Sequence, residues 1–275
     1  MVPSPADFAA LARSSPWLWS TLRLTYAGLG SRTRERGVRA WLRRPNVLRV
    51  ETMAGELVQV VHEPAKSVAL LTWDGAGGQQ NVTEQLSRPN DPGVPQPILR
   101  DDGLVAERPG GWSARLDYDA PMFQNYYWVA LLDPVELADG TDRTGDGPGG
   151  TVPGTTIDDV AVVDHHGREA WQALVRPRGA YEPRCGCCQL LPSRESDLLE
   201  WGENRPEALL AHYPDAYRVR LDRATGVCVR AEAIGGDTAG DGHEVVIEAV
   251  DEEMGDALFP EQRPTWRQRT RLRRA

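Results

Sequence analysis

Residues 41–51 read WLRRPNVLRVE, and around this stretch the chain carries its clearest structural signal. The side chains that precede the central proline alternate in character, so that the apolar Val38 and Leu42 share one face. A period of two is typical of a half-buried β-strand. Proline cannot donate a hydrogen bond to a strand ladder, and asparagine favours turns. Pro45 and Asn46 therefore predict the turn of a β-hairpin.

The same strand period recurs along most of the chain. Strands are expected at residues 18–26, 38–43, 47–51, 56–62, 67–73, 160–163, 169–175, 217–221, 227–231 and 245–249, and helices near residues 5–13, 120–137 and 196–211. Strands and helices do not alternate in a sustained way, which favours an antiparallel sheet over a doubly wound parallel one. The glycine-rich residues 139–156 are expected to form a loop.

Short motifs in this pattern resemble those of a known family. Arg44, Pro45 and Asn46, followed by Leu48 and Arg49, resemble the second-hairpin signature of the bacterial lipoprotein-carrier family with its LolA-like fold. Mycobacterial lipoprotein carriers and envelope-stress sigma-factor regulators are related to that family. The segments GREAW at 167–171 and LDRATG at 221–226 are similar to the strands that close its sheet.

The resemblance implies a mainly β (α+β) fold. In that fold a curved antiparallel sheet, or an incomplete barrel, carries helices over its concave face. We expect residues 1–260 to form a single domain of this kind, because 275 residues with 40% hydrophobic side chains can supply one large core. Residues 261–275 are rich in arginine and are expected to form a basic, flexible tail.

Charge and hydropathy exclude some functions. The net charge of −9 argues against a general nucleic-acid-binding protein, since phosphate contacts need a cationic surface. No window approaches the ~20 apolar residues of a transmembrane span, and the first residues lack the order of a signal peptide. The sequence as written therefore predicts a cytoplasmic protein, and an extracytoplasmic one if the true start lies upstream.

No constellation of residues typical of an active site is present in the sequence, so we expect a non-catalytic binding protein. The predicted ligand is an acyl chain, a lipid or a similar apolar molecule, such as a lipoprotein carries. It would lie in an apolar cleft between the strands and an aromatic helix. The expected ligand-binding residues are Leu22, Leu24, Val38, Ala40, Leu42, Phe123, Tyr126, Trp128, Trp171, Val219 and Leu221.

Four cysteines suggest an alternative function. Cys185, Cys187 and Cys188 lie within four residues. Cys228 follows in a predicted strand, where the alternation places it on the polar face with Arg230 and Glu232. Four thiolates can close a tetrahedral site for one Zn²⁺. A redox pair and free structural thiols use the same residues, and both alternatives stay open. The alternative function is an intracellular regulatory or protein-interaction module with a cysteine-based metal or redox site.

Overall fold

A computed structural model describes residues 2–30, 37–63, 67–73, 79–85, 94–109, 120–141, 151–202 and 205–261. Its centre is a nine-stranded sheet in the order β11-β12-β13-β14-β15-β1-β2-β3-β4. Every neighbouring pair is antiparallel, and the sheet is not closed into a barrel. The predicted fold class is therefore confirmed. The bounds are β1 Thr21–Leu29, β2 Val38–Arg43, β3 Val47–Thr52, β4 Leu57–His62, β11 Thr155–His165, β12 Arg168–Pro177, β13 Ala216–Asp222, β14 Cys228–Ile234 and β15 Gly242–Val250.

The predicted hairpin is formed by β2 and β3, which pair up to Arg43 and Val47 on either side of the turn. The peptide bond before Pro45 is cis. Arg44 reaches back to the first helix, where its guanidinium donates to the carbonyl oxygen of Ser15 at 2.7 Å. Asn46 donates from its side-chain amide to the carbonyl oxygen of Glu63 at 3.0 Å. The motif therefore ties the hairpin to a helix on one side and to the end of β4 on the other.

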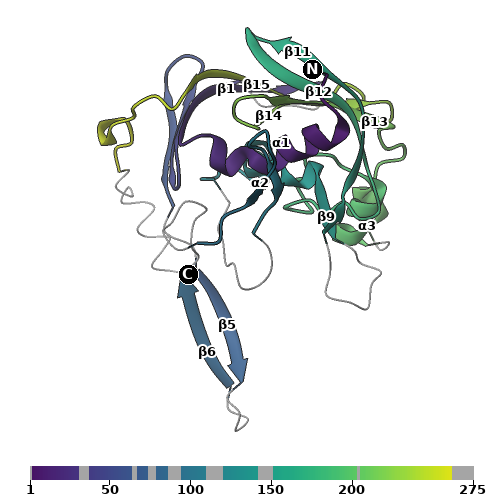
Figure 1. Ribbon diagram of the computed structural model, residues 1–275, viewed down its shortest axis with the longest axis horizontal. Coiled ribbons are helices and arrows are strands. Elements are labelled where there is room, and N and C mark those ends of the chain that lie inside the picture. Colours follow the sequence, from purple (N-terminus) through teal and green to yellow (C-terminus); the bar gives the residue numbers. More distant parts are fainter. Residues whose placement is uncertain are drawn as a thin grey trace.

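Two helices lie under the arch of the sheet (Figure 1): α1 (Pro5–Leu18) and α2 (Tyr126–Leu132). A capping box between Ser4 and Asp7 begins α1. The helix is longer than the predicted 5–13, because its second half is buried against the fold and burial outweighs the proline at position 16.

The other predicted helices are shorter than expected. The segment near 120–137 contains only α2 and the 3₁₀ turn η1 (Val135–Leu137), since Pro134 separates them. The segment near 196–211 contains α3 (Arg194–Trp201), which ends at Gly202, and η2 (Pro206–Ala208). A further 3₁₀ turn, η3 (Asp256–Leu258), follows the last strand.

Three small two-stranded sheets complete the described structure. They pair β5 (Ser67–Trp73) with β6 (Gln79–Gln85), β7 (Ile98–Leu99) with β8 (Val105–Glu107), and β9 (Asp139–Thr141) with β10 (Thr151–Pro153). Figure 1 shows β5 and β6 projecting away from the arch. The loop expected at 139–156 thus carries strands at both ends, and its residues 142–150 lie outside the described residues, as do residues 262–275 of the predicted tail.

The hydrophobic core fills the space between the sheet and α1 and α2. Phe8 and Leu11 of α1 are fully buried and belong to the same cluster as Leu22 and Leu42 on the inner face of the sheet. The helix therefore occupies the concave face. No helix among the described residues has the length and apolar character needed to cross a membrane.

Gly226 controls how closely the β13–β14 turn approaches α1. Its φ is +68°, and a β-carbon at this position would lie 2.8 Å from the carbonyl oxygen of Leu11. We expect Gly226→Ala to lower the free energy of unfolding by roughly 1–2 kcal/mol from left-handed strain and by another ~1–3 kcal/mol from overpacking. Urea unfolding measures the total.

Gly240→Ala is the matched control. Gly240 has a φ of +82°, but nothing lies within 4 Å of a β-carbon there. This variant should show only the backbone strain. Equal destabilisation of the two variants would contradict the close approach of the turn to α1.

Candidate functional site

A cavity of about 390 Å³ lies where the β13–β14 surface meets the segment from the cysteines to η2. Tyr217 of β13 pairs with Ala233 of β14, and Ala231 stands two residues away on the same face. The small alanine side chains leave a depression in the sheet surface. Most of its lining is apolar or aromatic, from Tyr127, Leu190, Trp201, Leu210, Tyr217 and the two alanines.

Residues 184–190, the cysteine segment, cover this cavity. The carboxylate of Glu136 holds both ends of this segment. It accepts a hydrogen bond from the backbone N–H of Arg184 at 2.9 Å and one from that of Leu190 at 3.1 Å. The hydroxyl of Tyr181 donates to the same carboxylate at 2.5 Å. Burial raises the pKa of Glu136, and these three donors oppose the rise.

A second set of hydrogen bonds places α3 beside the cysteine turn, which is formed by residues 185–188 within the cysteine segment. Gln189 donates from its amide to the carbonyl oxygen of Gly186 and to the carboxylate of Asp197, both at 2.7 Å. The hydroxyl of Tyr213 donates to the other oxygen of Asp197 at 2.7 Å. Tyr217 donates to the carbonyl oxygen of Pro192 at 2.5 Å. The covering segment is thus connected to the sheet that forms the cavity floor.

His243 lies behind the cavity wall and is fully buried. One ring nitrogen is 2.8 Å from the carbonyl oxygen of Cys228, so it must carry the proton and donate. The other nitrogen lies 2.7 Å from the hydroxyl of Tyr127 and accepts its hydrogen bond. Burial lowers the pKa of His243 to about 4. Burial also raises the pKa of Tyr127 well above 10.0, so both groups are neutral near pH 7.

Protonation of His243 should destabilise the fold in mild acid. The pKa is about 4 in the folded protein and 6.5 as the reference value. The stabilising contribution is therefore present in full above pH 6.5 and is lost progressively between pH 6.5 and 4, by up to about 3 kcal/mol. Urea unfolding at a series of pH values measures this loss.

Two variants test whether His243, and not another titrating group, causes this loss of stability in mild acid. His243→Gln should be less stable at pH 7 and should lack this part of the pH dependence. His212→Gln should keep it, because the side chain of His212 is 80% exposed. If His243→Gln showed the same slope as the unchanged protein, another group would be responsible.

Three of the four cysteines cluster at the rim of the cavity, and Cys187 contributes to its lining. The sulfur of Cys187 lies 3.1 Å from that of Cys185 and 3.9 Å from that of Cys188. All three sulfurs lie within 4.8 Å of one another, and no disulfide joins them in the described structure. This cluster could hold a metal ion.

The thiols of the cluster differ in acidity. Burial opposes ionisation of Cys185, but hydrogen bonds from Cys187 and Cys188 outweigh it and lower the pKa of Cys185. The hydrogen bond with Cys185, together with the charges of Cys185 and Glu200, raises the pKa of Cys187. Burial raises the pKa of Cys188 to about 12. Cys185 is therefore the thiol that ionises most readily.

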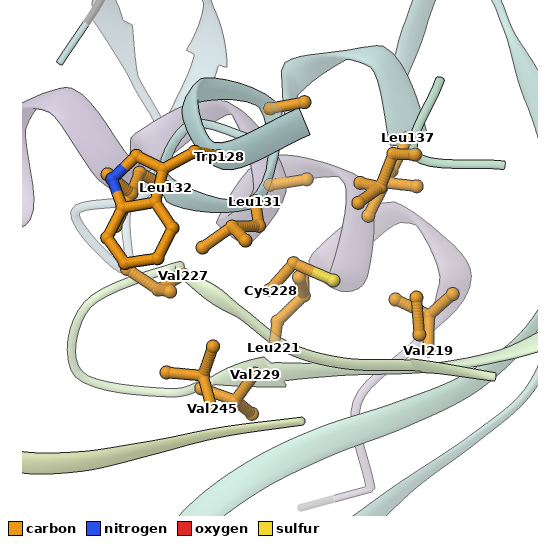
Figure 2. Close-up of a cluster of buried hydrophobic side chains, with 14 of the residues drawn as sticks. Trp128, Leu131, Leu132, Leu137, Val219, Leu221, Val227, Cys228, Val229 and Val245 are labelled. Atoms are coloured by element: carbon orange, nitrogen blue, oxygen red, sulfur yellow. The ribbon is translucent and has the colours of Figure 1, made fainter. Parts of the chain in front are cut away.

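Cys228 does not join the other cysteines. Its thiol is fully buried, and Figure 2 shows it between Leu131, Leu137 and Leu221 in the hydrophobic core. The strand alternation predicted an outward side chain, but the pairing of β13 with β14 shifts between Arg220 and Leu221. A β-bulge places two successive residues on one side of a strand. The predicted four-thiol site is therefore not assembled in this structure.

None of the eleven predicted ligand-binding residues lines this cavity. Ten of them are buried, while Tyr126 is 39% exposed. The predicted strand residues pack in the core with α1. Trp171 also borders a hollow whose lining includes the charged residues Arg100 and Arg223. A ligand among them stays a prediction that requires α1 to move. The residues that line the cavity could not be predicted from the sequence, because they come from segments far apart in the chain. The only local sign of a cavity was the pair of small residues Ala231 and Ala233.

The chain matches no protein family, and no curated protein matches it significantly. Among solved structures it is matched to the crystal structure of MucB, with 13% sequence identity and a TM-score of 0.37 over 95% of this chain and 67% of that chain. A likeness this distant carries no argument about function. The architecture described above rests on the strand pairing of this chain itself.

Proposed function

We propose that the protein is a non-catalytic binding protein that holds a small apolar molecule or an acyl chain in the cavity under α3. The observation that most supports this proposal is the apolar floor of the cavity, made by Ala231 and Ala233. The aromatic residues Tyr127, Trp201 and Tyr217 add to the lining. Ligand pockets of about 300–1,000 Å³ with mainly apolar walls and a few polar groups are typical of small-molecule sites. Gln189, Thr238 and Asp241 are polar residues of this lining.

The apolar lining favours a ligand with a hydrocarbon chain. Each buried methylene group gains ~0.8 kcal/mol, so that several of them can support binding without catalytic groups. Part of this gain is offset by the loss of translational and rotational freedom. The sequence resemblance to lipoprotein carriers points to the same class of ligand.

A second candidate function rests on the cysteine cluster. We propose that Cys185, Cys187 and Cys188 bind one Zn²⁺, because their sulfurs already converge. Such a site fits the regulatory or protein-interaction module as the alternative to a carrier.

Filling the cavity floor should weaken ligand binding. We expect Ala233→Leu to weaken binding of a fluorescent long-chain fatty acid at least about tenfold, which corresponds to 1.4 kcal/mol. Ala27→Leu adds the same atoms at an exposed position of β1 and should bind as the unchanged protein does. Fluorescence titration measures both affinities, and circular dichroism checks that both variants are folded.

Two results would contradict the proposed cavity. Equal affinities for the two variants would place the ligand elsewhere, with the predicted residues around Leu22 and Leu42 as the next site to test. No fatty-acid binding by the unchanged protein, together with no apolar molecule in solvent extracts of it, would favour the regulatory module.

A further inference from the structure

Glu200 of α3 lies directly on the cysteine turn. A β-carbon placed on Gly186 would be 2.1 Å from a carboxylate oxygen of Glu200 and 3.0 Å from its β-carbon. Gly186 stands between Cys185 and Cys187, so the acidic side chain packs against the middle of the cluster. The missing side chain at Gly186 is what makes this approach possible.

We propose that Glu200 supplies the fourth ligand of a metal ion held by Cys185, Cys187 and Cys188. The ion would then clamp the last turn of α3 to the cysteine turn. This inference rests on the zinc site proposed above and adds the fourth ligand and its structural effect.

The chemistry of zinc supports a carboxylate at this position. Structural zinc is almost always four-coordinate, and it accepts oxygen from glutamate as well as sulfur from cysteine. Sulfur atoms around such an ion lie roughly 3.7–3.9 Å apart, as follows from a Zn–S distance of ~2.3 Å. The distance from Cys187 to Cys188 is already 3.9 Å, whereas that from Cys185 to Cys187, at 3.1 Å, must widen. Each bound thiol releases its proton to solvent.

Other candidate ligands nearby are already engaged. Both carboxylate oxygens of Asp197 accept hydrogen bonds, and those of Glu136 accept three. Cys228 is buried in the core. Glu200 is exposed. Its carboxylate does not lie within 4.8 Å of all three sulfurs in this structure, so that it must turn toward them when the metal ion binds.

The clamp would act on the cavity. Cys187 and Trp201, which directly follows Glu200, both line it. A metal ion that joins the two segments would restrict their movement and hold the wall of the cavity in place. Metal binding is therefore expected to slow amide hydrogen exchange in α3.

The test is a Zn²⁺ titration of the reduced full-length chain against a chromophoric chelator. We expect one bound ion per chain, and its affinity should fall by about 10-fold or more in Glu200→Gln, as for loss of a group that supports a metal site. Glu195→Gln removes the same charge from the same helix, but it stands five residues away at the helix start and should bind as the unchanged chain does. Cys187→Ser should lose tight binding.

A second variant and a second measurement check the geometry. Gly186→Ala keeps all three thiols but displaces the Glu200 side chain, so it should weaken Zn²⁺ binding as Glu200→Gln does. With Co²⁺ as the probe, the unchanged chain should give the absorption of a tetrahedral site. Zn²⁺ should slow hydrogen exchange in α3 of Glu195→Gln but not of Glu200→Gln.

The outcomes separate this inference from the functions on which it rests. Equal affinity for Zn²⁺ in Glu200→Gln and Glu195→Gln would overturn the fourth ligand and the clamp, but would leave a three-cysteine site. Failure of the unchanged chain to bind Zn²⁺ more tightly than Cys187→Ser would overturn the zinc site as well. Neither result depends on fatty-acid binding, which tests the cavity separately.

Discussion

The buried carboxylate of Asp133 is the point at which distant parts of the fold are joined. It is fully buried and accepts hydrogen bonds from the guanidinium groups of Arg108 and Arg184. Burial would raise the pKa of Asp133, but the arginines outweigh it and lower the pKa. Arg108 also donates to the carbonyl oxygen of Arg13 in α1. Moving the arginines away would leave this buried charge unpaired, which costs roughly 3–5 kcal/mol. The ion pairs therefore hold one arrangement of α1, the end of α2 and the cysteine segment.

This arrangement explains why the open space is not where a curved sheet would first suggest it. Ser15 holds the C-terminal half of α1 under the arch. Its carbonyl oxygen accepts a hydrogen bond from the guanidinium group of Arg44 in the hairpin, and its hydroxyl donates to the carbonyl oxygen of Leu132. The concave face is thereby filled with side chains. Space remains at the β13–β14 side, where Ala231 and Ala233 are too small to fill it.

Much of the fold followed from local patterns. The alternation on either side of Pro45 and Asn46 predicted β2, β3 and their turn, and the strand period elsewhere predicted the antiparallel class. Helix ends were predicted less well, because they depend on burial: α1 continues past residue 13, and Pro134 divides the second helical segment. A helix end is set by a small difference in free energy that contacts across the fold can reverse.

The candidate sites show the limit of such patterns. A strand period is a property of neighbouring residues, and so the amino-acid order was enough to predict an antiparallel sheet and three cysteines within reach of one another. The order of residues alone placed Cys228 on the outer face, whereas a shift in strand pairing turned it into the core. The contact of Glu200 with Gly186 and the cavity itself join segments that are far apart in the chain. These features arise from packing, because only the folded chain brings such residues together.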